Sequence, residues 1–210
     1  MNALKIAFAL VSVAALAACG GGGGGIGGGG PVLLQPAPAG SFNAFVNDET
    51  LFLNEYYSNT LQPIRTQAMP TGGTAVYTGT AAFGNGRSTS STNGVISRSL
   101  PDMTGATTLN ANFGTARLNG TITNFRSADN TALPGTITLG NATINGNRIV
   151  QSSSVTGTVP LPGGQGNITF GQFNGGFVGQ NAAGFDGTLV VFANRSSGGQ
   201  TLNAVITADQ

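Results

Sequence analysis

Histidine is absent from the 210 residues, and lysine occurs once, as Lys5. Without histidine the chain cannot form a Ser-His-Asp or Cys-His catalytic arrangement. It also lacks the most common ligands of zinc and of haem iron. With no lysine after position 5, it has neither a Walker-type phosphate loop nor a lysine Schiff base. The sequence therefore predicts no enzymatic activity, no metal site and no cofactor.

Charged residues of both signs are scarce as well. Asp, Glu, Lys and Arg make up 7% of the chain, and the formal net charge is +1. A nucleic-acid-binding protein needs clustered cations that displace counterions from phosphates. We therefore expect no nucleic-acid partner, and solubility must come from the many Thr, Asn and Ser side chains.

The only cysteine, Cys19, lies near the N-terminus. A disulfide within the chain is thus excluded, and stability must come from a hydrophobic core. The chain after Cys19 is long enough to bury one sizeable core. We expect a single domain.

The N-terminal residues have the layout of a signal peptide. Lys5 precedes the apolar run "IAFALVSVAALAA", which is shorter than the ~20 residues that span a bilayer. The run ends in "LAAC", which resembles the lipobox of bacterial lipoproteins. The resemblance implies a signal peptide over residues 1–18, a lipid anchor on Cys19 in the membrane and, from Gly20, sorting to the outer membrane. The alternative is an ordinary secretory signal followed by a chance cysteine.

Residues 19–40 are of low complexity. "GGGGGGIGGGGPVLLQPAPAG" combines flexible polyglycine with stiffening prolines, which is typical of a disordered tether. The stretch contains G-x-G-x-x-G, but a dinucleotide site would need a preceding strand. The tether is the better interpretation.

From Thr74 onward, polar and apolar residues alternate with a period of two. The segments "TAVYTGTAAF", "GATTLNANF" and "TARLNGTITN" show the pattern, and turn-forming residues separate them. Eight or nine such strands, without a convincing helix, favour a barrel, because closure removes the sheet edges. Phe, Leu and Ile would fill the interior, and Thr, Asn and Arg would face water. A lipid-embedded barrel would need an apolar outer belt, which these strands lack. The prediction is an all-β, eight-stranded antiparallel barrel over residues 69–210.

Residues 41–68 are predicted to form an extension that packs on the barrel. The segment could be a short helix beginning at Asn47 or Asp48, or an extended segment on the outside of the domain, and we favour the extended form. Its aromatic residues Phe52, Tyr56 and Tyr57 are expected to close one barrel end or to pack against the wall, with a partner-binding patch as the alternative. The adjacent carboxylates of Asp48 and Glu49 are expected to be solvated.

Three segments resemble the barrels of the transferrin-binding protein B family. They are "MPTGGTAVYTGTAAFG", "FGTARLNGTITNF" and "GQFNGGFVGQNAAGFDGTLVV". The last has a Gly/Phe strand, then Gly-x-Asn-Ala beginning at Gly179, a short turn, and a Gly-Thr strand beginning at Gly187. The chain departs from the family in Gln180, where proline is frequent, and in having one barrel where the family pairs two handles with two barrels.

The resemblance implies a surface lipoprotein that binds a host or environmental protein, with iron or haem-carrier acquisition as one role. It also implies export by a surface-lipoprotein translocator. The alternative function is a structural envelope lipoprotein without an external ligand. Because the chain has no lysine after position 5, the glycine-rich segment cannot be a phosphate-binding loop, and we expect its glycines to be structural.

Two arginines are candidate ligand residues on predicted loop tips. Arg87 lies in "GNGRS" and Arg195 in "ANRSS", and binding residues are often found on such loops. The alternative is that both are solvated surface charges. Asp186 opens a "DGT" turn, where a local hydrogen bond to the backbone is expected.

Overall fold

The computed structural model describes residues 40–152, 154–196 and 198–210. The predicted signal peptide, the lipidation site at Cys19 and nearly all of the tether lie outside these residues. Within the described ranges, no helix has the length and apolar character needed to cross a membrane.

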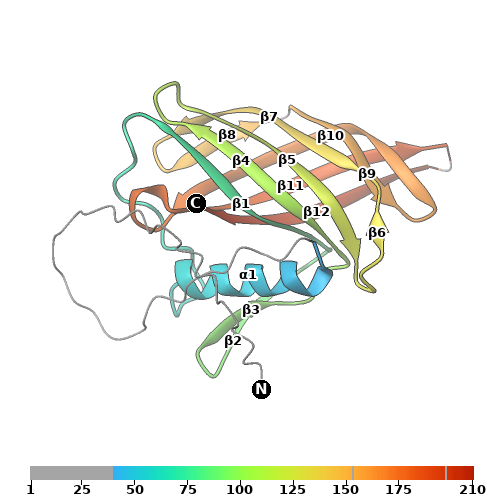
Figure 1. The fold of residues 1–210 in the computed structure, drawn as a ribbon, viewed down its shortest axis with the longest axis horizontal. Helices are drawn as coiled ribbons and strands as arrows, with labels where there is room; N and C mark the ends of the chain where they lie inside the picture. Colours follow the sequence, from blue (N-terminus) through green and yellow to red (C-terminus); the bar gives the residue numbers. More distant parts are fainter. Residues whose placement is uncertain (1–39, 153, 197) are drawn as a thin grey trace, which may run out of the picture. The chain divides into compact units, whose positions relative to one another are not determined.

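The described chain consists of one α-helix, one short 3-10 helix and twelve strands, several of them long (Figure 1). They are α1 (Phe42–Tyr56), β1 (Thr74–Phe83), β2 (Thr89–Thr92), β3 (Val95–Arg98), β4 (Met103–Asn112), β5 (Arg117–Ser127), β6 (Ala132–Leu133), β7 (Thr136–Asn145), β8 (Arg148–Ser152), β9 (Val155–Leu161), β10 (Gly164–Val178), η1 (Gln180–Ala182), β11 (Gly184–Arg195) and β12 (Gly198–Asp209).

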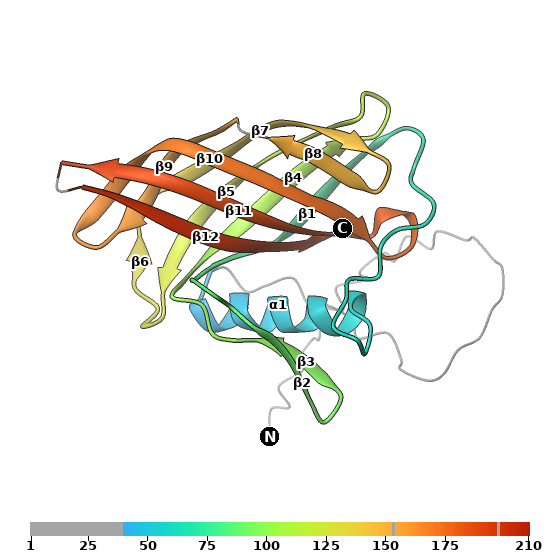
Figure 2. The same cartoon turned by 180° about the vertical axis from the view of Figure 1, so that it is seen from behind.

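The main sheet closes on itself as an antiparallel barrel. β1 pairs with β4 on one side and with β12 on the other, and β4, β5 and β7 follow in sequence. β8 and β9 both lie between β7 and β10, so together they make one position in the wall. β10, β11 and β12 complete the circle (Figures 1 and 2). The predicted eight-stranded antiparallel barrel is confirmed.

Large apolar side chains fill the barrel interior. β1 occupies the predicted segment, with Tyr77 and Phe83 buried inside. In β5, Leu118 and Ile122 point inward and alternate with exposed polar residues, as the period of two requires. The aromatic rings of the C-terminal half pack with one another; the centroids of Phe177 and Phe185 are 5.4 Å apart. The interior is a packed core, as expected.

Residues 42–56 form a helix, so the preference for an extended segment is wrong. The helix begins after Ser41, whose Oγ accepts a hydrogen bond from the Ala44 amide at 3.1 Å. Asn47 and Asp48, the predicted starting points, lie inside it. Its buried residues recur at helical spacing and face the barrel and the adjoining hairpin. They are Phe42, Phe45, Glu49, Phe52, Leu53 and Tyr56.

The β2–β3 hairpin packs against α1. The Asn54 side chain pairs with the backbone of Ile96, donating to its carbonyl at 2.8 Å and accepting from its amide at 2.9 Å. Figures 1 and 2 show the helix and the hairpin together on one side of the barrel. This side of the wall is therefore covered, and the Thr80 hydroxyl donates to the Phe45 carbonyl beneath the helix at 3.3 Å.

Candidate functional site

Arg87 does not lie at an exposed loop tip, so that expectation is wrong. Its guanidinium donates to both carboxylate oxygens of Glu49, at 2.8 and 2.6 Å, and the two side chains are 4% and 3% exposed. Its Nε donates to the Ser99 carbonyl at 2.8 Å. Glu49 is thus buried as well, contrary to the expectation that it would be solvated. Arg87 is therefore not part of an open ligand surface.

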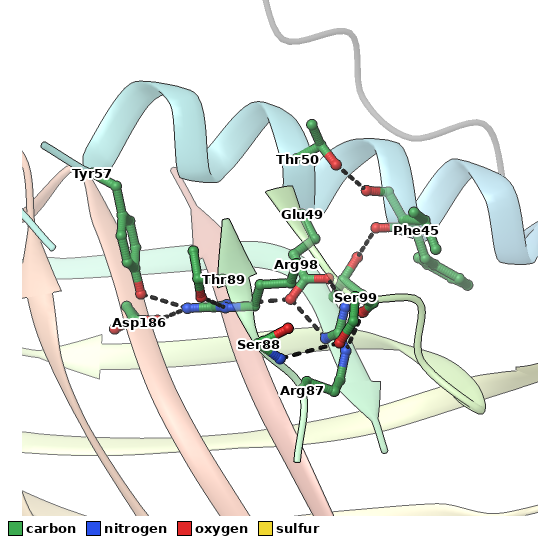
Figure 3. A network of polar contacts seen from close by, with 12 residues as sticks. Phe45, Glu49, Thr50, Tyr57, Arg87, Ser88, Thr89, Arg98, Ser99 and Asp186 are labelled. Atoms are coloured by element: carbon green, nitrogen blue, oxygen red, sulfur yellow. Dashed lines mark hydrogen bonds and ion pairs between the residues drawn. The ribbon is translucent and has the colours of Figure 1, made fainter. Parts of the chain in front are cut away.

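Glu49 and Arg87 belong to a larger polar network at the junction of helix, hairpin and barrel (Figure 3). Arg98 of β3 contacts Glu49 at 3.2 Å and Asp186 of β11 at 3.6 Å. It also donates to the Tyr57 hydroxyl at 2.5 Å. Arg65 reaches Asp186 from the other side at 3.4 Å. Asp186 therefore makes long-range ion pairs in a strand, and the expected local turn contact is wrong.

The charged groups of this network pair with one another and have a structural role. Burial raises the pKa of Asp186 above its ordinary value, and the charges of Arg98 and Arg65 partly offset that effect. Burial also raises the pKa of the Tyr57 hydroxyl. Two arginines hold each buried carboxylate, so neither Glu49 nor Asp186 is free to act on a ligand. The network fastens α1 and the hairpin to the barrel wall.

One end of the barrel is sealed by the chain itself. The Tyr77 hydroxyl, inside the barrel, donates to the Ala182 carbonyl of η1 at 2.6 Å. The Gln210 side chain donates to the same carbonyl at 2.9 Å. Burial raises the pKa of Tyr77 to about 12. η1 thus lies across this end.

The aromatic residues of α1 complete the seal. Phe52 and Tyr56 pack together, with ring centroids 4.7 Å apart, and lie against Gly184 at the start of β11. Phe52, Tyr56 and Tyr57 are all buried. The predicted packing against the barrel is confirmed, and the alternative of an exposed aromatic patch is wrong.

The opposite end of the barrel is hollowed by a cleft of about 540 Å³. It lies where β1 and β9 end and where β4, β10 and β12 begin, far along each strand from η1. Its wall is mainly apolar and its rim mainly polar. The wall includes Phe83, Met103, Leu133, Pro160, Leu161 and Leu202, and the rim includes Asn85, Asp102, Gln200 and Asn203.

Arg195 is found beside this cleft. It is the last residue of β11, and its guanidinium donates to the Pro162 carbonyl in the turn that lines the cleft. A Cβ placed at Gly163 would lie 2.8 Å from that guanidinium. Arg195 therefore adjoins the hollow end, whereas Arg87 belongs to the buried network. Sequence reasoning missed the cleft itself, because its wall comes from five segments that only closure brings together.

In the ranges that the structure describes, no group of three or more His, Cys, Asp or Glu side chains could hold a metal ion. The hollow end instead has a concave apolar surface with hydrogen-bonding groups at its edge.

The fold and the two ends define the class of protein: a closed antiparallel barrel with a packed interior, one sealed end and one hollowed end.

The comparison with known families identifies the barrel more closely. The sequence pattern of the family described as the C-lobe and N-lobe beta barrels of Tf-binding protein B matches residues 69–210. The chain belongs to this family. No curated protein matches the chain.

Solved structures similar to this chain include transferrin-binding proteins. Intact Ap-TbpB, with N and C lobes, is 22% identical over 70% of this chain and 28% of that one, with a TM-score of 0.44. A double mutant of the transferrin-binding protein B vaccine antigen from Haemophilus parasuis Hp5 has the same identity and coverage and a TM-score of 0.43. A structure described as a surface lipoprotein is 18% identical over 70% of this chain and 64% of that one, with a TM-score of 0.39. The chain thus spans less than a third of the transferrin-binding proteins it matches.

Proposed function

We propose that this protein is an outer-membrane-anchored lipoprotein whose barrel binds a protein ligand at the cell surface through its hollow end. The observation that carries the proposal is the asymmetry of the barrel. One end is sealed by η1 and the aromatic residues of α1, and the other presents a cleft with an apolar wall and a polar rim. That composition is typical of protein interfaces, which have an apolar centre and a hydrated polar edge.

The barrel also supplies a rigid support for its rim. The Gly84 amide donates to the Asn203 carbonyl at 3.0 Å, and the Asp102 amide donates to the Phe83 carbonyl at 2.8 Å. Loops held in this way on a packed scaffold lose little conformational entropy on binding. The hollow end therefore suits a preformed recognition surface better than the threonine-rich side walls do.

The finer part of the proposal concerns ligand and location. The description of the matched family refers to Tf-binding protein B, which supports an iron-carrying protein as the ligand. A haem-carrying protein is the alternative ligand. A lipid on Cys19, a tether over residues 19–40 and export by a surface-lipoprotein translocator would present the barrel to that ligand. The proposed role is binding rather than catalysis, since the two buried carboxylates already hold arginines.

Protease treatment of intact cells tests the location. An antibody against the barrel follows the protein before and after treatment, and lysed cells are the control. We expect the barrel signal to be lost from intact cells. Protection until the cells are lysed would place the barrel in the periplasm, and a structural envelope role would then replace the proposal.

A matched pair of variants tests the binding surface. Gln200→Arg places a long cation on the rim, and Val150→Arg places the same side chain on the exposed outer wall of β8. Cells producing each variant are incubated with iron-loaded transferrin or with haem-carrier proteins, and the retained protein is measured. We expect Gln200→Arg to reduce retention and Val150→Arg to leave it unchanged. Equal effects of the two variants would contradict binding at the hollow end.

A further inference from the structure

The cleft at the hollow end also has the properties of a small-molecule site. Its volume of about 540 Å³ falls within the range of roughly 300–1,000 Å³ that is typical of ligand pockets. Phe83, Met103 and Leu161 form its floor and are 2%, 7% and 9% exposed, so these side chains belong to the packed interior. Half-buried Leu133 and Leu202 stand above them. An occupant would therefore meet hydrocarbon on several sides.

Polar groups are confined to the edge of the cleft. Asn203 donates to the Asn85 side chain at 2.8 Å, and Gln200 lies exposed on the same strand as Asn203. Asp102 is the one charged residue of the lining, and it is exposed at the rim. The nearby Arg195 guanidinium keeps its positive charge while it donates to the Pro162 carbonyl. The edge thus offers amide groups together with one charge of each sign, which gives neither an anionic nor a cationic head group a net attraction.

We propose that the cleft binds the alkyl chain of an uncharged amphiphile, with the polar head among the amides of the rim. Burial of a chain in a preformed apolar cleft is favourable, because apolar surface is removed from water without creating a new cavity. This site does not depend on whether a protein ligand binds to the rim. It can therefore be present even if the barrel proves to be periplasmic.

Photolabelling of the isolated full chain tests the site. The probe is a dodecanol with a diazirine near the end of its chain, and labelled peptides are located by mass spectrometry. We expect labelling to concentrate on the segments around Met103, Leu161 and Leu202. Unlabelled alkanols should compete with a strength that rises roughly four-fold per methylene while the chain still fits. Labelling spread over exposed apolar residues such as Phe170 and Val76 would overturn the proposal.

Two tryptophan variants of β12 provide the matched comparison. Leu202→Trp places a large ring in the cleft, whereas Thr201→Trp places it on the exposed outer face of the same strand. We expect Leu202→Trp to abolish cleft labelling and Thr201→Trp to preserve it. If Leu202→Trp does not fold, Leu133→Gln serves instead, because a polar amide in the apolar wall should also reduce labelling. Unchanged cleft labelling in whichever of these two cleft variants folds would overturn the proposed site.

The head-group preference is tested with the corresponding dodecanoic acid probe at neutral pH. We expect weaker cleft labelling than with the alcohol, and a smaller difference between the two probes in Asp102→Asn. Equal labelling by both probes in the unmodified chain would overturn the uncharged head group. Because these measurements use the isolated chain, their failure is distinguishable from failure of the surface-binding proposal, which is tested on cells.

Discussion

Glu49 shows what one buried charge does in this protein. It lies on the face of α1 that packs toward the barrel, among aromatic and aliphatic side chains. Its carboxylate meets Arg87 and Arg98, which approach from the segment before β2 and from β3. Three separate parts of the chain thus share one ionic contact, and only the folded arrangement provides the partners.

Glu49→Gln should therefore destabilise the fold strongly. The variant leaves the buried Arg87 and Arg98 without their shared carboxylate, and breaking a buried ion pair typically costs about 3–5 kcal/mol. Urea unfolding measures the change in the free energy of unfolding. The control is Glu55→Gln on the exposed face of the same helix, expected to change it by less than ~0.5 kcal/mol. Equal effects of the two variants would show that the network adds little to stability.

Gly179 is a second residue whose identity the fold requires. Its φ is +74°, in the left-handed region, and an added Cβ would lie 2.7 Å from the Tyr56 ring. The glycine-rich segment from residue 171 onward thus contains a strand end, a tight turn and a close aromatic contact. The prediction that its glycines are structural follows from the absence of lysine, which excludes a phosphate-binding loop, but the contact with Tyr56 could not be inferred from the sequence.

Gly179→Ala should be more destabilising than Gly94→Ala. Gly94 has a φ of +79° in the β2–β3 turn, with nothing within 4 Å of an added Cβ. Gly94→Ala should therefore show backbone strain alone, about 1–2 kcal/mol, whereas Gly179→Ala adds the steric conflict. Thermal unfolding of both variants gives the comparison. A larger loss in Gly94→Ala would contradict the packing described for the sealed end.

At the scale of elements, the sequence predicted the strands of the barrel but not the helix α1. β5 alternates from Arg117 to Ile122, because one face meets the core and the other meets water. In β1 the last four residues, from Thr80 to Phe83, are all buried, and Thr80 lies beneath α1. In α1 the helical signal lies in the spacing of Phe45, Phe52 and Tyr56, which fall on one face. The buried Glu49 interrupts that apolar face, so the helical pattern is hard to recognise in the sequence. A glutamate is expected to face solvent unless the arginines that pair with it in the fold are known.

The position of the helix start can be tested directly. Ser41→Ala removes the side-chain oxygen that accepts from the Ala44 amide and should lower stability by about 1 kcal/mol. Asn47→Ala, at an exposed position within the helix, should be neutral or slightly stabilising, because alanine has the higher helix propensity. Urea unfolding distinguishes the two. A loss only in Asn47→Ala would indicate that the helix begins at the later position.

The contact between α1 and the end of β12 should make stability depend on pH. Burial raises the pKa of Asp48 to about 6, and burial with repulsion from Glu55 and Asp48 raises that of Asp209 to about 6. Both pKa values exceed the pKa of aspartate in the unfolded chain, so the folded state binds these protons more tightly. The stabilisation of the fold by the two bound protons is complete below pH ~4 and is lost as the pH rises through about 6.

The free energy of unfolding should therefore increase when the pH falls from about 7.5 to about 5. Asp48→Asn should be more stable than the unmodified chain at the higher pH and should gain less on acidification. Asp129→Asn is the control, since hydrogen bonds from Ser127 and Thr131 lower the pKa of Asp129. Urea unfolding at both pH values measures these differences. A loss of stability on acidification over this interval would contradict the assignment.

At the scale of the whole molecule, the sequence predicted the barrel but not the contrast between its ends. Period-two segments and turn residues suffice to predict a closed sheet of eight positions. The cleft depends on where five strand ends meet after closure, and the seal depends on η1 reaching Tyr77. Arg195 was predicted on a loop tip, and it lies at the end of β11 beside the cleft, because the end of a strand is a local property of the sequence. Arg87 was misplaced because its partner Glu49 lies 38 residues away in the chain.

We propose that the hollow end of the barrel, and not the sealed end, receives the ligand. Photo-crosslinking tests this with a photoreactive benzoylphenylalanine at Gln200 on the rim or at Asn145, the exposed last residue of β7 beside the sealed end. Intact cells are irradiated in the presence of iron-loaded transferrin or haem-carrier proteins, and adducts are detected by immunoblot. We expect adducts from Gln200 and none from Asn145. Adducts from Asn145 alone, or from neither position, would contradict ligand binding at the hollow end.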